Sequence, residues 1–318
     1  MKIVVLDGYT LNPGDNPWTE VEKLGDFTVH DRTPADQIVE RAQEADVVLT
    51  NKTPISAETI AALPSLKFIA VLATGYNVVD IQAARARGIS VSNVPIYGTD
   101  SVAQFVIALL LQHCHHAALH QQAVKNGQWA ASGDFSFWNT PIIELAGKKM
   151  GVVGFGRIGR RVGELAHALG MEVLAYDIYH GDPPTYSPFA WKEVRELFAE
   201  ADVVSLHAPQ TADNTEMVNK DLLSVMKSNA FLINTARGGL VHEADLAKAL
   251  NNDQIAGAAL DVVSKEPIEE SNPVFSAKNC YITPHIAWAT LAARKRLMQT
   301  TAENIAAYAE GSPINVVN

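Results

Sequence analysis

The chain has 318 residues, of which 47% are hydrophobic and 19% charged, and its formal net charge is -10 at pH 7. This length allows two domains of ordinary size. The negative charge argues against nucleic acid or an anionic membrane as the main partner. The longest apolar run, residues 105–111, is too short to span a bilayer. Two cysteines, and an N-terminus that begins as a strand rather than as a signal peptide, predict a cytoplasmic protein.

The first third of the chain alternates short apolar strands with helical patterns. Strands are predicted at 3–6, 45–50, 68–72 and 89–92, and helices at 34–45 and 56–63. Such alternation builds a parallel sheet with helices on both faces.

Three residues after the third predicted strand attract attention: Ala73, Thr74 and Gly75. They follow the carboxyl end of a strand, where open α/β sheets bind ligands. Exposed backbone N–H groups there could hold a small carboxylate. An ordinary strand-to-helix loop explains the same residues equally well.

Residues 99–121 predict one long helix, apolar nearly all round in its middle and therefore buried. His113, His116 and His120 have a spacing compatible with metal ligands, but no carboxylate joins them in that helix. A polar helix face is therefore favoured, and no metal site is predicted. Residues 127–145 are irregular and rich in aromatic side chains, which is typical of an interface or a pocket wall.

A glycine motif lies at the centre of the chain. A buried strand at 150–155 leads into Gly154, Gly156 and Gly159, spaced as G-x-G-x-x-G, and a helix follows. Gly154 allows a sharp turn, Gly156 lets the backbone approach a pyrophosphate, and Gly159 lets the helix pack closely on the strand. The helix N-terminus offers N–H groups and partial positive charge to phosphates. The motif predicts a dinucleotide site.

The next strand supports this interpretation. Residues 172–176 end at Asp177, about where the fingerprint places an acid for the ribose hydroxyls. A carboxylate there repels a 2′-phosphate, and no Arg or Lys stands at 178–180, so NAD is favoured over NADP. A strand–helix turn without a ligand is the simpler alternative, but the complete strand–turn–helix context argues against it.

The alternation resumes after the motif. Strands are predicted at 201–207, 230–234, 256–263 and 280–283, with helices at 243–250 and 291–310. We therefore predict an α/β chain with two doubly wound parallel-sheet (Rossmann-like) units. The expected division is a substrate domain of residues 1–98 plus 289–318 and an NAD-binding domain of residues 99–288.

Three chemically suited residues follow successive strands of the second unit: Arg237, Glu266 and His285. Strand ends of a parallel sheet meet at one edge, so we expect these side chains to converge beside the nicotinamide. Arg237 can bind a carboxylate and polarise a carbonyl. His285, as an imidazolium, can protonate a developing alkoxide, and Glu266 can hold its other ring nitrogen. The set suits hydride transfer to a 2-oxo acid.

Each of these residues also has a simpler explanation. Arg237 could be a surface residue, Glu266 a turn residue before proline, and His285 a helix cap. Asp261 lies within a predicted buried strand and needs a partner, for which a nicotinamide carboxamide is one candidate.

These stretches resemble the D-isomer-specific 2-hydroxyacid dehydrogenase family. The resemblance is carried by VLATGYNVVD (71–80), VGFGRIGRRV (153–162), SLHAPQTADNT (205–215), INTARGGLVHEADL (233–246), ALDVVSKEP (259–267) and TPHIAWAT (283–290). It implies a homodimer of two-domain subunits, with the active site in the cleft between the domains. It also implies catalysis by Arg237, Glu266 and His285, with the substrate bound by the 73–75 backbone, Arg237 and His285. The implied cofactor contacts are Gly154, Phe155, Gly156, Arg157, Ile158, Gly159, Asp177, His207, Pro209, Thr215, Thr235, Ala236 and Asp261.

Within the family, the segments FSFWNTPIIELAGK and HIAWAT are similar to glycerate dehydrogenases, also called hydroxypyruvate reductases. This similarity implies hydroxypyruvate and D-glycerate as the substrate pair, with glyoxylate also accepted, and a Trp138 that reaches the pocket of the partner subunit. Two alternatives stay open. One is a D-lactate or branched D-2-hydroxyacid dehydrogenase, and the other is a non-catalytic NAD-sensing binding protein.

Overall fold

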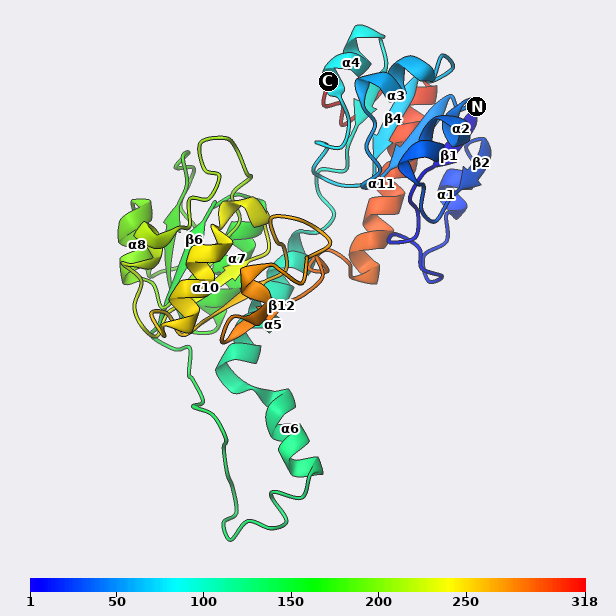
Figure 1. Cartoon of the computed structure of the whole chain (residues 1–318). Coiled ribbons are helices and arrows are strands. Elements are labelled where there is room, and N and C mark those ends of the chain that lie inside the picture. The colour runs from blue at the N-terminus through cyan, green and yellow to red at the C-terminus, as the bar shows by residue number, and fades with distance from the viewer. The chain divides into compact units, whose positions relative to one another are not determined.

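The computed structural model describes all 318 residues. The chain divides into two compact units: unit 1 is Met1–Gly98 with Ala289–Asn318, and unit 2 is Thr99–Trp288. Each unit contains one parallel sheet with helices on both faces (Figure 1). The predicted α/β class with two doubly wound sheets is therefore confirmed.

Unit 1 is built on five parallel strands in the order β2-β1-β3-β4-β5. The strands are β1 (Lys2–Val5), β2 (Asp26–Val29), β3 (Val47–Thr50), β4 (Phe68–Val71) and β5 (Ser90–Ser92). The helices are α1 (Thr19–Glu22), α2 (Ile38–Ala42), α3 (Ala57–Ala62), α4 (Ile81–Ala86) and α11 (Leu291–Ala309), with a 3-10 turn, η1, at Ala35–Gln37. The strand order reverses between β1 and β3, the position at which doubly wound sheets bind ligands.

Alternating side chains of unit 1 fill two cores. Ile3 and Val5 pack on the face covered by α1 and α11, whereas Val4 and Leu6 pack on the face covered by α2, α3 and α4. This period of two in strands that are apolar throughout is what a sheet buried on both faces requires. The last helix, α11, contributes the fully buried Leu297 to the first of these cores.

Unit 2 is built on seven parallel strands in the order β12-β11-β10-β9-β6-β7-β8. The strands are β6 (Lys149–Val153), β7 (Glu172–Tyr176), β8 (Phe189–Trp191), β9 (Val203–Leu206), β10 (Phe231–Asn234), β11 (Gly257–Leu260) and β12 (Cys280–Ile282). The helices are α5 (Thr99–His115), α6 (Ala117–Lys125), α7 (Arg157–Ala168), α8 (Val194–Glu200), α9 (Lys220–Leu223) and α10 (Glu243–Asn251), with 3-10 turns η2 at Gly238–Leu240 and η3 at Pro273–Ser276. Helices α5 and α7 cover one face, and α8, α9 and α10 the other. The order reverses between β6 and β9.

The single long helix predicted at 99–121 is wrong. His116 adopts a left-handed backbone conformation with φ 46°, which ends α5 and begins α6 at a bend of 51°. No single helix is long and apolar enough to cross a membrane, and only the bent α5–α6 pair passes such a test, by length and composition alone.

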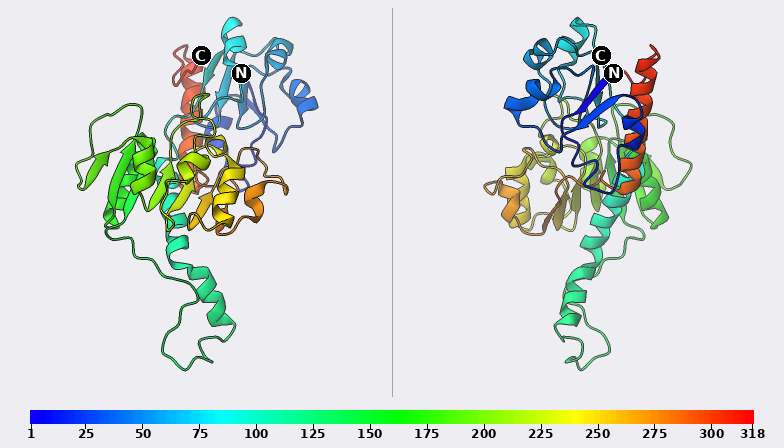
Figure 2. Two further views of the ribbon diagram at one scale, coloured as in Figure 1. Left: turned by 60° about the vertical axis from the view of Figure 1, so that its left-hand side comes forward. Right: turned by 90° about the vertical axis from the view of Figure 1, so that its right-hand side faces the viewer.

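The residues after the bend form an arm, defined here as residues 117–144. Helix α6 has no buried residue, and the arm projects away from the seven-stranded sheet (Figures 1 and 2). Its exposed large apolar side chains are Leu119, Val124, Trp129, Phe135, Trp138 and Ile142. A row of unpacked apolar side chains of this kind is typical of a protein–protein interface.

Candidate active site

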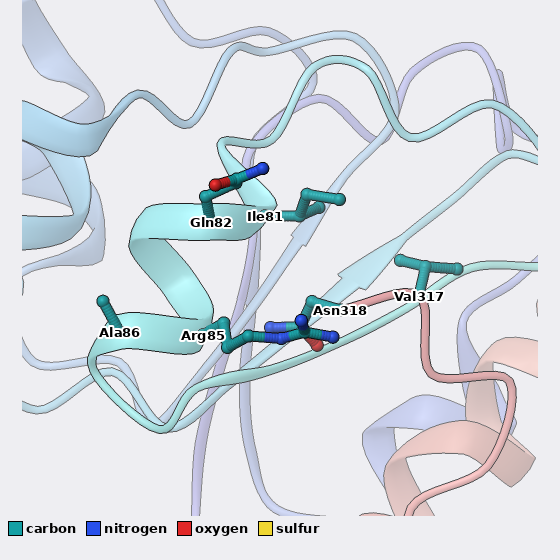
Figure 3. Close-up of a pocket in the computed structure, with 6 residues that line it drawn as sticks. All are labelled: Ile81, Gln82, Arg85, Ala86, Val317 and Asn318. Carbon is teal, nitrogen blue, oxygen red and sulfur yellow. The ribbon is translucent and has the colours of Figure 1, made fainter.

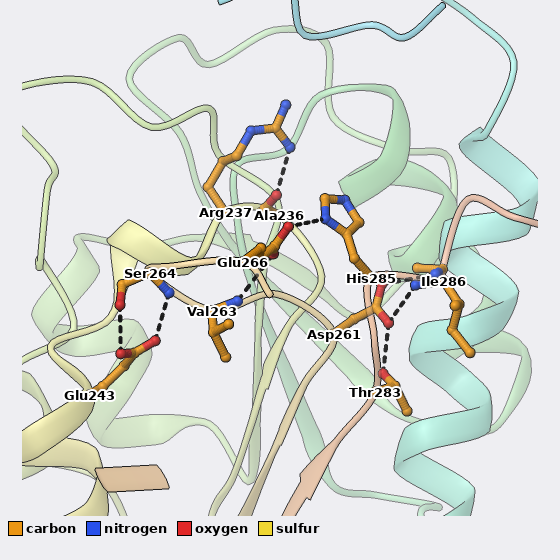
Figure 4. A network of polar contacts seen from close by, with 11 residues as sticks. Ala236, Arg237, Glu243, Asp261, Val263, Ser264, Glu266, Thr283, His285 and Ile286 are labelled. Carbon is orange, nitrogen blue, oxygen red and sulfur yellow. Dashed lines mark hydrogen bonds and ion pairs between the residues drawn. The ribbon is translucent and has the colours of Figure 1, made fainter. Parts of the chain in front are cut away.

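Three neighbouring strands of unit 2 place the predicted catalytic residues at one sheet edge. Arg237 follows β10, Glu266 follows β11 and His285 follows β12, and these strands are adjacent and parallel. All three side chains lie at the carboxyl ends of their strands (Figure 4). The sheet topology, rather than closeness in sequence, therefore assembles the set.

Glu266 and His285 form a direct contact. Nδ1 of His285 lies 2.7 Å from Oε2 of Glu266, and both side chains are about one-third exposed. The other carboxylate oxygen of Glu266 accepts a hydrogen bond from the backbone N–H of Val263 at 3.3 Å. A carboxylate held at Nδ1 fixes the orientation of the ring, which leaves Nε2 to face a ligand.

Asp261 anchors the loop that carries the histidine. Its carboxylate is 1% exposed and accepts hydrogen bonds from Thr283 Oγ1 at 2.6 Å and from the N–H groups of Ile286 and Ala287 at 2.9 and 2.8 Å. Burial raises the pKa of Asp261, against the effect of these donors. The Asp261 carbonyl accepts the N–H of His285 at 2.8 Å. Asp261 thus has partners within the chain, which the sequence analysis did not foresee.

Arg237 is presented on a turn that glycine makes possible. A Cβ atom at Gly238 would lie 1.9 Å from the carbonyl carbon of Val263, so only glycine allows the turn to pack against the β11 loop. Asn234 closes the turn, since its side chain accepts from Ala236 N at 3.0 Å and donates to the Arg237 carbonyl at 2.9 Å. The Arg237 guanidinium is exposed, and its Nη1 donates to the Ala236 carbonyl at 2.7 Å.

The glycine motif has the geometry of a phosphate-binding turn. Gly154 has φ 91°, and a Cβ atom there would lie 2.4 Å from the backbone nitrogen of Ala208. A Cβ atom on Gly159 would lie 2.1 Å from the Gly154 carbonyl oxygen. At Gly156, in contrast, a Cβ atom would meet nothing within 4 Å. The protein itself therefore does not require glycine at position 156, whereas a phosphate seated on this turn would.

Helix α7 starts at Arg157, and no side chain caps its N-terminus. Its first N–H groups are therefore available to an anion. Asp177 is tied to the same turn, because Oδ2 accepts the N–H of Phe155 at 2.7 Å. The side chain of Phe155 itself is buried against Phe189 and Trp191, so only its backbone can face a ligand.

The remaining predicted cofactor residues lie at the same edge of the sheet. His207 follows β9, and burial lowers its pKa to about 3, so its ring is neutral; the ring bonds the Ser205 hydroxyl at 2.8 Å. Thr235 follows β10, and its hydroxyl is buried without a hydrogen-bond partner. An orphaned buried hydroxyl suits a site completed by a ligand. Pro209 and Thr215 lie in an exposed loop.

Unit 1 carries the predicted carboxylate-binding loop after β4. No acceptor in the chain takes the N–H groups of Thr74, Gly75 or Tyr76. The loop is nevertheless held, because Thr74 Oγ1 donates to the Val94 carbonyl at 2.9 Å and Val94 N donates to the Ala73 carbonyl at 3.0 Å. Free N–H groups on a fixed loop form a site for a small anion.

Two residues that the sequence analysis missed support this loop. Asp7, after β1, accepts the N–H groups of Asn51, Lys52 and Thr53 at 2.8, 2.6 and 2.7 Å. The Asn51 side chain then donates to the Leu72 carbonyl at 2.6 Å. The only signal in the sequence is an acid directly after a strand. These contacts lie where the strand order of unit 1 reverses.

Other features do not form part of the site. The helix histidines do not converge on a metal-binding geometry: His113 stacks on Phe231 at 4.0 Å, while His116 bonds the Tyr281 hydroxyl at 3.2 Å.

A pocket of about 270 Å³ in unit 1 is lined by α4 and the last two residues (Figure 3). None of the predicted site residues lines that pocket. Trp138 is 66% exposed on the arm.

Together, the uncapped glycine turn with its acid, the neutral His207 and the Arg–Glu–His set define a nicotinamide-dependent oxidoreductase. A family model described as D-isomer specific 2-hydroxyacid dehydrogenase, NAD binding domain, matches residues 107–287. The chain is 49% identical to a hydroxypyruvate reductase of Blautia hydrogenotrophica over 100% of both chains. It is 39% identical to a glycerate dehydrogenase of Methylorubrum extorquens, over 89% of this chain and 88% of that relative.

A solved structure of an NADPH-dependent glyoxylate/hydroxypyruvate reductase from Sinorhizobium meliloti, in complex with NADP and malonate, is similar with a TM-score of 0.82. It is 28% identical in sequence, and the match covers 99% of this chain and 96% of that one. The chain belongs to the D-isomer-specific 2-hydroxyacid dehydrogenase family, as its sequence motifs predicted.

Proposed function

We propose that this enzyme uses NADH to reduce hydroxypyruvate to D-glycerate, with glyoxylate as a second substrate. The proposal rests on one observation above all. The residues His285, Glu266 and Arg237 follow the three consecutive strands β12, β11 and β10, and the carboxylate of Glu266 holds the histidine. The chain that carries them matches a hydroxypyruvate reductase along its whole length.

The chain's own residues account for binding and proton transfer. A bound nicotinamide cofactor supplies the hydride for C2 of the substrate. Nε2 of His285 then donates a proton to the former carbonyl oxygen, and Glu266 stabilises the imidazolium before this transfer. Arg237 binds the substrate carboxylate through its planar guanidinium and polarises the carbonyl. In the reverse direction His285 accepts the proton from the hydroxyl.

Unit 1 is proposed as the substrate domain and unit 2 as the NAD-binding domain. The N–H groups of Thr74 and Gly75 have no acceptor in the chain, which supports a role for this loop in holding a small carboxylate.

A preference for NAD over NADP is proposed from Asp177. Its carboxylate is fixed at the glycine turn by the N–H of Phe155, where it suits two ribose hydroxyls and repels a 2′-phosphate. The next residues, Ile178 and Tyr179, are 95% and 77% exposed and carry no positive charge that would attract a phosphate.

We also propose a homodimer assembled through the arm, with Trp138 reaching the pocket of the partner subunit. Six large exposed apolar side chains on the arm support a second copy of the chain as the occupant of that surface. A reducing cytoplasmic location fits two free cysteines whose thiol pKa values burial raises to about 11 for Cys114 and about 12 for Cys280.

The decisive experiment measures NADH oxidation with hydroxypyruvate, glyoxylate, pyruvate and 2-oxoisocaproate in parallel, and repeats each assay with NADPH. We expect the highest kcat/KM for hydroxypyruvate and NADH. If pyruvate or 2-oxoisocaproate is preferred, the family membership stands and the proposed substrate is wrong. If nothing is reduced while NADH still binds, an NAD-sensing role replaces the enzymatic one.

A further inference from the structure

The loop that carries Glu266 is held from two sides. On one side is the turn of Arg237: a Cβ atom on Gly238 would lie within 2.0 Å of the Val263 carbonyl oxygen and 2.4 Å of Ser264 N. The two catalytic loops therefore touch through their backbones. A displacement of residues 263–264 would disturb both Arg237 and Glu266.

On the other side is Glu243, the first residue of α10. One carboxylate oxygen accepts the N–H of Ser264 at 2.7 Å, and the other accepts the Ser264 hydroxyl at 2.7 Å (Figure 4). The second oxygen also accepts the side-chain amide of Asn272 at 2.8 Å. Glu243 thus binds both the backbone and the side chain of Ser264, which lies two residues before Glu266.

An acid in the first turn of a helix is often explained by the helix dipole alone. Here the three donors that Glu243 binds all belong to the segment 264–272 and none to its own helix. A hydrogen bond to an ionised acceptor is stronger than a neutral one. Glu243 therefore acts as a clamp, in that its hydrogen bonds fix the loop that follows β11 to the start of α10.

We propose that Glu243 is a positioning residue of the active site, which acts through Ser264 to hold Glu266 against His285. The proposal rests on the reductase function proposed above. Without the clamp, the loop moves and the contact between Glu266 and His285 weakens. The imidazolium that donates the proton then loses part of its stabilisation, so proton transfer slows.

The charged and titratable neighbours are few, so the effect can be isolated. Near the His285–Glu266 pair lie Arg237 and the buried Asp261, while Lys265 is paired with Glu269. Near Glu243 lies Cys280, whose pKa is raised to about 12 mainly by burial and further by the Glu243 charge. Its thiol is therefore protonated at neutral pH.

The experiment compares the wild type with E243A, E243Q and S264A in the full-length protein. Glu196, an exposed acid in the first turn of α8, provides the matched control E196A. The imidazole signals of His285 are followed by NMR at one fixed pH, assigned by their loss in H285Q and compared with those of E266Q. The kcat and KM for hydroxypyruvate reduction are measured in parallel, with NADH affinity and Tm.

In E243A we expect the imidazole signals of His285 to move from their wild-type positions toward those of E266Q, because the contact with Glu266 weakens. We also expect kcat to fall about 10-fold, with NADH affinity unchanged within about twofold. E243Q, which keeps one acceptor oxygen, and S264A, which keeps the backbone contact, should shift less in the same direction. E196A should shift neither quantity.

A double-mutant cycle shows whether Glu243 acts through Glu266. In an E266Q background, E243A should produce no further movement of the His285 signals and no further fall in kcat. A lower Tm with unmoved His285 signals would show that Glu243 has only a structural role, and an equal movement in the E266Q background would also refute the proposal. If the wild type reduced no 2-oxo acid, the reductase proposal would fail, while the NMR signals would still decide the role of Glu243.

Discussion

Nδ1 of His285 lies 2.7 Å from Oε2 of Glu266, and this contact joins the ends of the neighbouring strands β11 and β12. The two residues are 19 positions apart in the chain. Their contact depends on the register in which Leu260 pairs with Ile282. The pairing of these two strands therefore assembles the proposed proton donor and its carboxylate.

Replacement of the proposed proton donor, His285, is expected to remove most of the activity. In H285Q the side chain cannot deliver a proton at neutral pH, so kcat should fall by roughly 10²–10⁴-fold. NADH affinity, measured by fluorescence titration, should stay within about twofold of the wild-type value. Turnover at the wild-type rate would show that another group donates the proton.

Loss of the arginine should affect binding and rate together. Arg237 is proposed to contact both the carboxylate and the carbonyl, so R237A should raise KM for hydroxypyruvate and lower kcat, each about 10-fold or more. R237K keeps the charge but not the planar fork and should recover only part of the loss. A wild-type KM in R237A would exclude the dual role.

Asp177 is expected to set the choice of cofactor. D177A removes the negative charge and the contact with Phe155 N, so the preference for NADH over NADPH in kcat/KM should fall by about 10-fold. The check is steady-state kinetics with both cofactors at saturating substrate. An unchanged preference would mean that other residues discriminate the 2′-phosphate.

Asp7 should act on substrate affinity from unit 1. D7N leaves one amide oxygen where a carboxylate accepts three N–H groups, so the loop at 51–53 and its contact to Leu72 should loosen. KM for hydroxypyruvate should rise about fivefold while NADH affinity is unchanged. The exposed Asp26 on β2 supplies the control D26N. Equal effects of D7N and D26N would contradict this role.

His113 should make the protein sensitive to acid. It is buried against Phe231 with neither ring nitrogen hydrogen-bonded, and burial lowers its pKa from 6.5 to about 4. The unfolded chain therefore binds more protons between these values, so stability is lost as the pH falls through this window. At pH 5 the loss amounts to about 2 kcal/mol. H113F should retain the stacking and remove this part of the loss.

The measurement for H113F is the free energy of unfolding in urea at pH 7.5 and pH 5. The exposed His115, on the same helix, provides the control H115Q, which should keep the acid sensitivity. An identical drop in stability for the wild type and H113F between the two pH values would exclude His113 as the source.

Most of the fold was predictable because its signals are local. Runs of valine and isoleucine predicted the buried central strands, and the glycine spacing at 154–159 predicted the turn before α7. The sequence did not predict β2 and β8. Both strands lie at the edges of their sheets and are only partly buried, so their sequences resemble those of loops. The break at His116 was missed because the apolar pattern continues through it, and a non-glycine residue with positive φ leaves no mark in the sequence.

In the candidate site, too, the residues with a local signal were predictable and those that depend on distant contacts were not. Arg237, Glu266 and His285 could be identified because each directly follows a strand, and parallel topology brings strand ends together. The supporting contacts could not be identified in this way. Asp7 binds residues 44–46 positions away, and Glu243 binds a loop 21 positions away. Such pairings exist only in three dimensions, because any surface acid would read the same in the sequence.

The position of β12 has a further consequence for the order in which the enzyme loses activity and unfolds. This strand is only three residues long and forms one edge of the seven-stranded sheet, yet His285 lies in the loop that directly follows it. Edge elements open with a smaller free energy than the centre of a sheet. Under mild denaturant, catalysis should therefore disappear before the cofactor-binding half of the sheet unfolds. Hydrogen exchange of the backbone amides at 280–283 should speed up at the denaturant concentration at which activity is lost.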